Sequence, residues 1–257
     1  MQVERASGAD WRDPAAYSPL LAADFSLIAW EWLRRDAYYR LAAERALAGG
    51  ARTGQEGNGA PEFGLVAFED PRLPVPHARP LWRFDLHPYV LRVERSRSAF
   101  DRDAFDLAAL PGAATLLVDG DGEHLLLSDG LRAIRLDGPA GAFSDGPAPL
   151  RYFIEGLASA RAPLVTLRRF LALSRAGRFE HSLHRREAKA LRWILMLRAH
   201  DALAVGADQR TIAQQLFSRS ADQPRWRSRE PDVRSRAQRL VRSARALAAG
   251  GYRSLLS

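Results

Sequence analysis

The strongest constraint on the fold of this chain is an apolar stripe of helical period over residues 231–249. Apolar side chains recur there at every third or fourth position, which is the spacing of one face of an α-helix. They are Val233, Ala237, Leu240, Val241, Ala244, Leu247 and Ala248. Pro231 suits a first helical turn, and Gly250 and Gly251 mark the end. The segment is therefore predicted to be a helix that buries this stripe in a core.

The face opposite the stripe is rich in arginine. At about 100° per residue, that face holds Ser235, Gln238, Arg239, Arg242 and Arg245, with Arg234 and Arg236 on its flanks. These side-chain types bond to phosphates and to base edges in the major groove of DNA. Two interpretations are open: a helix that recognises DNA, or a helical bundle with a solvated basic face.

The segment "TIAQQLF", residues 211–217, is typical of the first helix of a DNA-binding helix-turn-helix, and Asp208 suits its N-cap. Thr211 is the candidate DNA contact at its start. A standard turn of three or four residues does not fit, because residues 218–230 intervene before the next helix. A stretched turn would place Arg225, Arg227 and Arg229 along the DNA backbone.

Charge divides the chain into two parts. Residues 163–257 hold 20 basic and 7 acidic side chains, whereas residues 1–162 hold 18 basic and 23 acidic ones. An arginine bias in the codons would act on both parts alike. The asymmetry therefore indicates a module that binds a polyanion, attached to a neutral or acidic region. Double-stranded DNA is the favoured polyanion, because arginine neutralises phosphates and releases their counterions.

Other functional classes find little support. The chain has no cysteine, which excludes disulfides and thiolate metal sites. Serine-elbow, phosphate-loop and dinucleotide-binding motifs are absent, so no catalytic residue, metal or cofactor is expected. No uncharged run reaches the length of a membrane span, and the first residues resemble no signal peptide. We expect a cytoplasmic protein that is not an enzyme.

The first two thirds of the chain are predicted to contain both helix and strand. Helical spacing runs from about Ser26 to Leu47, and a glycine-rich stretch follows. The run "TLLVDGDGEHLLLSDGLRAIRLDG" predicts three antiparallel strands joined at Asp-Gly turns, whose two central residues would need positive φ in a type I′ turn. Two further helices are predicted in the basic part: one with Leu164, Leu167, Phe170 and Leu171 on one face, and a longer one that ends near Gly206.

These elements predict an α+β protein with an N-terminal helix, a small antiparallel β-meander and an all-α C-terminal domain like a helix-turn-helix. The predicted segments are residues 1–48 (helical), 49–62 (linker), 63–158 (β-rich, for oligomerisation or partner contact) and 163–257 (DNA-binding).

The C-terminal part resembles a proteobacterial family of transcriptional activators, RovC-like and FseA-like, whose C-terminal domain is a helix-turn-helix variant. The resemblance rests on "RWILMLRAHDALAVGADQRTIAQQLF" and "WRSREPDVRSRAQRLVRSARALAAGGYRSLL", and on "DWRDPAAYSPLL", "WEWLRRDAYYR" and "FGLVAFEDPRLP" near the N-terminus.

The resemblance implies a DNA-binding activator of genes for conjugative-element transfer or type VI secretion. It also implies a homo-oligomer, a dimer or larger up to a hexamer, with RNA polymerase or an antiactivator as a further partner. The alternative is a protein-interaction module, itself similar to an antiactivator, whose basic face meets an acidic partner.

Overall fold

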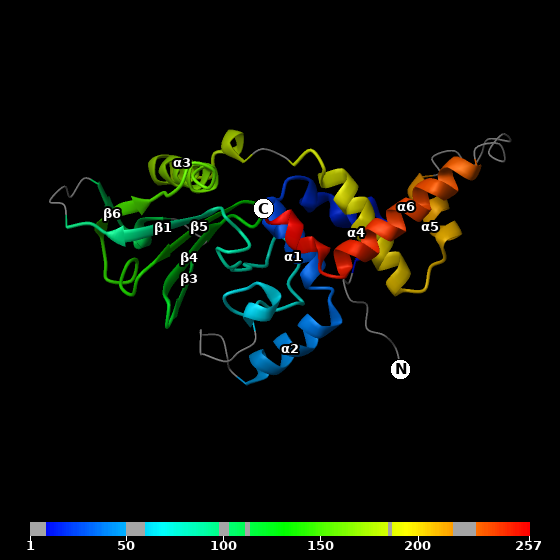
Figure 1. Cartoon of the computed structure of the whole chain (residues 1–257), viewed down its shortest axis with the longest axis horizontal. Helices are drawn as coiled ribbons and strands as arrows, with labels where there is room; N and C mark the ends of the chain where they lie inside the picture. The colour runs from blue at the N-terminus through cyan, green and yellow to red at the C-terminus, as the bar shows by residue number, and fades with distance from the viewer. Residues whose placement is uncertain (1–8, 50–59, 98–102, 111–113, 185–186, 218–229) are drawn as a thin grey trace.

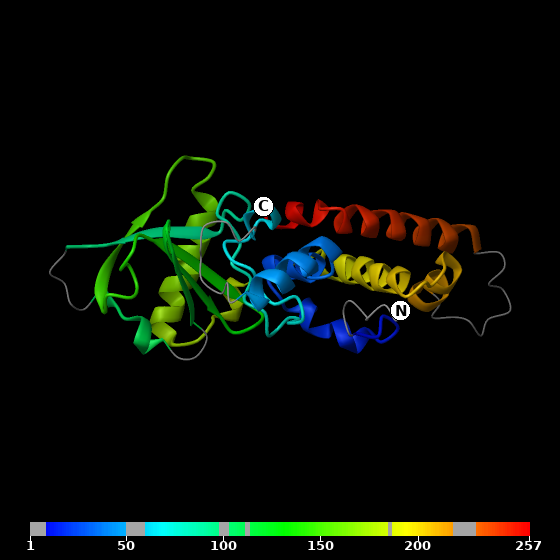
Figure 2. The same cartoon turned by 90° about the horizontal axis from the view of Figure 1, so that it is seen from below.

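The computed structural model describes residues 9–49, 60–97, 103–110, 114–184, 187–217 and 230–257. The molecule is elongated, with a β-sheet at one end and the helices α5 and α6 at the other (Figures 1 and 2). Helices come first along the chain, then strands, then helices again, so the predicted α+β class is confirmed. No helix within the described residues is long and apolar enough to cross a membrane.

The N-terminal region contains two α-helices where the sequence predicted one. A 3₁₀ helix, η1 (Pro14–Leu21), is followed by α1 (Phe25–Leu33) and α2 (Ala37–Ala48). The prediction of one continuous helix is wrong because Asp36 caps a new one: its carboxylate accepts the N–H groups of Tyr38 and Tyr39. Short 3₁₀ turns η2 (Ala60–Phe63), η4 (Leu107–Ala109) and η5 (His181–Leu183) occur further along the chain.

Six strands form one sheet. They are β1 (Val90–Arg95), β2 (Ala104–Phe105), β3 (Ala114–Asp119), β4 (Gly122–Ser128), β5 (Ala133–Gly138) and β6 (Ala148–Phe153), in the order β2-β6-β1-β5-β4-β3. The predicted antiparallel meander is confirmed in β3, β4 and β5. The sheet is larger than predicted, because β1 lies parallel to β5 and also pairs with β6.

The β3–β4 turn differs from the type I′ turn that the Asp-Gly signal predicted. Its central residues are Gly120 and Asp121, and no residue other than glycine has a positive φ within the described ranges. The carboxylate of Asp119 closes the turn by accepting the N–H groups of Asp121 at 2.9 Å and Gly122 at 3.1 Å. Side-chain hydrogen bonding therefore replaces the backbone geometry that we expected.

Helix α3 (Arg161–Ala176) packs against the sheet (Figure 1). Phe170 and Leu173 pack against Leu91 and Leu136 in a core that the sheet and α3 share. Gly177, in the left-handed conformation at φ 64°, ends the helix. The predicted apolar face is only partly right, because Leu164 and Leu171 are exposed. The helix is apolar over a wide arc, and the sheet covers only one side of that arc.

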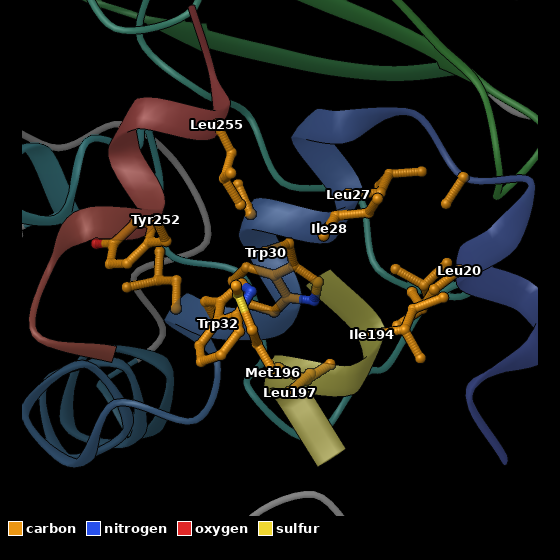
Figure 3. Packing of buried hydrophobic residues seen from close by; sticks show 14 of the residues in the cluster. Leu20, Leu27, Ile28, Trp30, Trp32, Ile194, Met196, Leu197, Tyr252 and Leu255 are labelled. Atoms are coloured by element: carbon orange, nitrogen blue, oxygen red, sulfur yellow. The ribbon is translucent and has the colours of Figure 1, made fainter. Parts of the chain in front are cut away.

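A second core joins the two ends of the chain. It includes side chains of α1, α4 (Ala190–Ala204), α5 (Gln209–Phe217), α6 (Glu230–Ala248) and the last turn η7 (Gly251–Leu255). Trp30 and Trp32 of α1 lie beside Met196 and Leu197 of α4, while Leu255 reaches α1 from the C-terminal end (Figure 3). The N-terminal helices and the C-terminal helices therefore share one hydrophobic core. The boundary at residue 163 stays a prediction.

Asp24, at the N-cap of α1, connects this helical part to the sheet. Its N–H donates to the carbonyl of Leu131 at 2.8 Å, and its carboxylate accepts the N–H of Ala133 at 2.9 Å. The same carboxylate lies 3.2 Å from Nδ1 of His184, which is buried in the segment between α3 and α4. One buried carboxylate thus holds α1, the β4–β5 turn and the α3–α4 connection together.

Candidate nucleic-acid interface

Helix α5 begins at a carboxylate cap. The N–H of Thr211 donates to Oδ1 of Asp208 at 2.7 Å. Hydrogen bonds from the Thr211 side chain and from this N–H hold the pKa of the Asp208 carboxyl below its usual range. Ile212 and Ala213 are buried, which fixes one side of the helix in the core. Gln209, Arg210, Gln214 and Gln215 are exposed, and Thr211 is half-buried. Helix α5 therefore presents amide and guanidinium groups to solvent.

Helix α6 buries the predicted stripe. Ala237, Leu240, Val241 and Ala244 are buried, and Val233, Leu247 and Ala248 are partly so. This confirms the predicted core face. The predicted polar face is exposed at Arg234, Arg236, Gln238, Arg239, Arg242 and Arg245, and Ser235 is half-buried. From Arg234 to Arg245 the exposed side chains extend over about 17 Å of helix.

The arginines of α6 differ in pairing from several arginines elsewhere in the chain. Arg35 and Arg135 are buried in ion pairs, and Arg92 and Arg132 also contact carboxylates. Among the side chains that the structure describes, no carboxylate forms an ion pair with an arginine of residues 233–249. Residues 233–249 contain no acidic side chain. The outer face of α6 thus carries positive charge that this part of the chain does not neutralise.

Helices α5 and α6 run in opposite directions. At one end of the pair, the guanidinium of Arg236 lies 4.6 Å from the ring centroid of Phe217, the last residue of α5. At the other end, Gln209 at the start of α5 lines a groove of about 390 Å³ with Gln238, Val241, Arg242 and Arg245. The chain therefore reverses direction between α5 and α6. Residues 218–229 connect the two helices, a connection longer than the turn of three or four residues in a tight helix-turn-helix.

The candidate residues therefore occupy different positions. Gln238, Arg242 and Arg245 converge on the groove between α5 and α6. Arg236 is exposed but stacks on Phe217, an attraction of about 0.5–1 kcal/mol at exposed sites. Arg234 and Arg239 are exposed and are not among the residues that line this groove. The predicted contacts Arg225, Arg227 and Arg229, with the rest of the predicted stretched turn at 218–229, lie outside the described residues.

A buried polar network that sequence reasoning missed supports these helices. Asp201 of α4 accepts hydrogen bonds from Arg35 and from the hydroxyl of Tyr17, and Arg35 also pairs with Glu31. Burial by itself would raise the pKa of the Asp201 carboxyl, but the positive charge of Arg35 holds that pKa well below its usual range. Burial raises the pKa of the Tyr17 hydroxyl, and the charge of Asp201 raises it further.

A second buried polar network is formed by Arg198 of α4, which holds the segment before η1. Arg198 donates from Nε to the carbonyl of Trp11 at 2.8 Å and from Nη2 to the carbonyl of Arg12 at 2.9 Å. The sequence signal for both networks is weak: Arg35, Arg198 and Asp201 are charged residues inside otherwise apolar helical patterns. Such residues are rarely buried unless they are paired, and their partners lie far away in the sequence.

Comparison with protein families gives two matches. Residues 149–257 match the family model described as "T6SS, Transcription factor, DNA binding domain", and residues 10–62 match the model described as "Proteobacterial transcriptional regulator-like domain". No curated protein and no solved structure matches the chain. Helices α1 and α2 of the N-terminal match and helices α4, α5 and α6 of the C-terminal match share the core around Trp30 and Leu197. Within the described residues, no group of three or more His, Asp or Glu side chains is arranged to hold a metal ion.

Proposed function

This chain belongs to the RovC-like proteobacterial transcriptional regulators, and we propose that it binds duplex DNA through the arginine face of α6. One observation carries the proposal: the exposed arginines of α6 stand opposite a buried stripe and have no carboxylate partner within the described residues. A solvated surface helix would explain the amphipathic pattern. It would not explain why arginine gathers on residues 233–249, which contain no acidic side chain.

The core prepares this face for binding. Because Leu240, Val241 and Ala244 are packed against α4 and α5, the helix is held as a rigid support, which reduces the entropy lost when a ligand binds. An α-helix fits the major groove of duplex DNA, where arginine bonds to guanine and glutamine to adenine. Gln238, Arg242 and Arg245 supply such groups together with Gln209 of α5.

The regulatory role is the second part of the proposal. We propose that the protein acts in the cytoplasm as an activator of type VI secretion or conjugative-element genes. The description of the matched DNA-binding model, which names type VI secretion and a transcription factor, supports this role. An activator must also contact the transcription machinery. The sheet lies at the other end of the molecule from α6 (Figure 2), so it stays accessible to RNA polymerase when α6 is on DNA.

A second candidate function is binding of an acidic protein by the same face, as an antiactivator would do. The long connection between α5 and α6, residues 218–229, favours this alternative, because it departs from the tight-turn unit that docks in a major groove. The same arginines would then meet carboxylates instead of phosphates.

Binding measured over a salt series separates the two functions. The full-length protein is titrated with duplex fragments, with single strands of the same sequence and with heparin. A DNA-binding regulator prefers one duplex, and its affinity falls with salt in proportion to the phosphates contacted. Equal affinity for all three polyanions would overturn the proposal in favour of the acidic-protein alternative. The DNA recovered with the protein from its own cells supplies the duplex to be tested.

A further inference from the structure

Helix α3 packs on the sheet with one side and leaves its other side to solvent (Figure 1). Opposite its buried side chains runs an exposed stripe, which we call the α3 stripe. It consists of Arg161, Leu164, Arg168, Leu171 and Arg175. At about 100° per residue, these five positions fall within an arc of roughly 80°. We propose that the α3 stripe binds an acidic amphipathic helix of another protein. The stripe lies at the opposite end of the molecule from α5 and α6, so it is separate from the proposed DNA-binding face (Figures 1 and 2).

The spacing within the α3 stripe is that of a helix seam. Leu164 and Leu171 are 51% and 47% exposed and lie seven residues apart, and Leu157, seven residues earlier and just ahead of the helix, is fully exposed. The three arginines of the stripe have the same repeat of seven. Two helices that pack lengthwise meet along such a repeat, and the stripe extends over about 21 Å of helix. A second helix is therefore the occupant whose shape fits.

Charge determines the kind of helix. Helix α3 contains no acidic residue, and Arg161 lies in its first turn, where the helix dipole disfavours a positive charge. Among the described residues, no carboxylate forms an ion pair with an arginine of the stripe. The neighbouring Arg169, which is only partly exposed, lies 3.9 Å from Asp24 and donates to the carbonyl of Leu183. A helix with carboxylates opposite the arginines and apolar side chains opposite the leucines complements the stripe.

The described helices of this chain offer no such acidic face. Glu31 of α1 and Asp201 of α4 are buried in ion pairs, and α2 presents only Glu44. Helix α5 has no acidic residue, and those of α6, Glu230 and Asp232, stand within its first three positions. A second copy of α3 would bring arginine against arginine. The partner is therefore a different protein.

Duplex DNA and an anionic membrane fit the stripe less well. Phosphates would pair with its arginines but leave its leucines in water. A helix that lies in a membrane surface buries a large apolar face, whereas the apolar face of α3 around Phe170 is already packed on the sheet. Leucine and arginine together on one narrow stripe are typical of contact between protein helices.

Titration of full-length protein with synthetic helical peptides tests this surface. The acidic peptide has roughly three heptads, with leucine at the position that faces the leucines of the stripe and glutamate at the position that faces its arginines. The basic peptide has lysine in place of each glutamate. Measured by fluorescence anisotropy, the parent protein should bind the acidic peptide at least about tenfold more tightly than the basic one.

The variants separate the α3 stripe from other basic surfaces. Arg168→Glu should weaken binding of the acidic peptide by about tenfold or more, and it should bind the basic peptide more tightly than the parent does. Leu164→Ser/Leu171→Ser should also weaken binding of the acidic peptide. Arg45→Glu is the matched control and should change nothing, because Leu41 and Arg45 of α2 are exposed at the same spacing as Leu164 and Arg168.

Three results would overturn the proposal. They are a parent protein that does not prefer the acidic peptide, α3 variants with the parental dissociation constant, and α3 variants that lose affinity for duplex DNA or phosphatidylglycerol vesicles instead of the peptide. If Arg168→Glu does not fold, as judged by its circular dichroism melt, Arg168→Gln replaces it. Arg239→Ala/Arg242→Ala should bind the acidic peptide as the parent does, so this outcome is independent of whether α6 binds duplex.

Discussion

Arg35 and Asp201 form a buried two-point ion pair: Nε lies 2.7 Å from Oδ1, and Nη2 lies 2.9 Å from Oδ2. Arg35 follows α1, and Asp201 lies in α4, 166 residues further along the chain. Their side chains are 2% and 5% exposed. The pair therefore joins the N-terminal helices to the helices that carry the candidate DNA-binding face.

Removing one partner of this pair should destabilise the whole helical part. Arg35→Ala leaves the Asp201 carboxylate buried without its cation, and breaking a buried pair in this way costs about 3–5 kcal/mol. Urea unfolding measures the loss. Arg72→Ala is the matched control, since the Arg72–Asp70 pair has an arginine that is 82% exposed and such pairs contribute about 0–1 kcal/mol. Equal effects of the two substitutions would refute the structural role of the Arg35–Asp201 pair.

His87 makes the stability depend on pH. Its imidazole is buried, with Nδ1 3.3 Å from the carbonyl of Leu256, and burial lowers its pKa from 6.5 to about 4. Below pH 6.5 this histidine is protonated in the unfolded chain, whereas in the folded chain it stays neutral until the pH falls to about 4. The contribution of His87 to the free energy of unfolding is therefore fully present above pH 6.5, and about 3 kcal/mol of it is lost as the pH falls towards 4.

Denaturant unfolding at pH 7 and at pH 4.5 checks this dependence. His87→Phe, which keeps a ring beside Phe25 and Tyr89, should reduce the difference between the two pH values. His77→Phe changes an exposed histidine instead and should preserve it. If His87→Phe retains the full parental pH dependence, the proton is taken up elsewhere.

Leu240 tests the core face of α6. The residue is 8% exposed and packs in the core shared with α1 and α4. Leu240→Ala should lower the free energy of unfolding by about 2–5 kcal/mol, because it removes a buried side chain and leaves a cavity. Leu191→Ala, at a position that is 66% exposed, should change it by about 0.5 kcal/mol or less. Identical thermal melts for parent and Leu240→Ala would show that this face of α6 is not packed.

Local patterns predicted the parts of the fold that are set locally. The stripe of α6 repeats with the helical period, and the β3–β4–β5 meander follows from short turns, so both were predictable. The break between α1 and α2 was missed because Asp36 caps a helix inside a run that keeps the helical period. Neither the parallel pairing of β1 with β5 nor the Arg35–Asp201 pair leaves a local trace, because each joins distant segments.

In the candidate site, too, some features follow from the local sequence and others depend on contacts between distant segments. The exposure of Arg239 and Arg242 follows from their position opposite Leu240 and Val241 on one helix. The antiparallel arrangement of α5 and α6 does not follow from either helix alone. It depends on contacts such as that of Arg236 with Phe217, whose partners lie on different helices.

Double substitution of Arg239 and Arg242 by alanine tests the central claim, that the outer face of α6 binds DNA. Neither side chain belongs to the buried stripe, so stability should change by about 0.5 kcal/mol or less. The binding free energy should nevertheless weaken. Loss of an arginine that contacts a base should cost about 1–3 kcal/mol of binding free energy and relax discrimination at one base position. Loss of a phosphate contact should weaken binding to all sequences and reduce the salt slope by about 1.

The measurement is a salt-dependent titration of full-length parent, Arg239→Ala/Arg242→Ala and Arg12→Ala proteins with the duplex recovered from cells. Arg12 lies in the N-terminal region, far in sequence from α6, and its substitution should leave DNA affinity unchanged. We expect the double variant to keep the parental melt, lose affinity and show a shallower salt slope. Parental affinity and parental salt slope in the double variant would contradict the assignment of α6 as the DNA-binding helix.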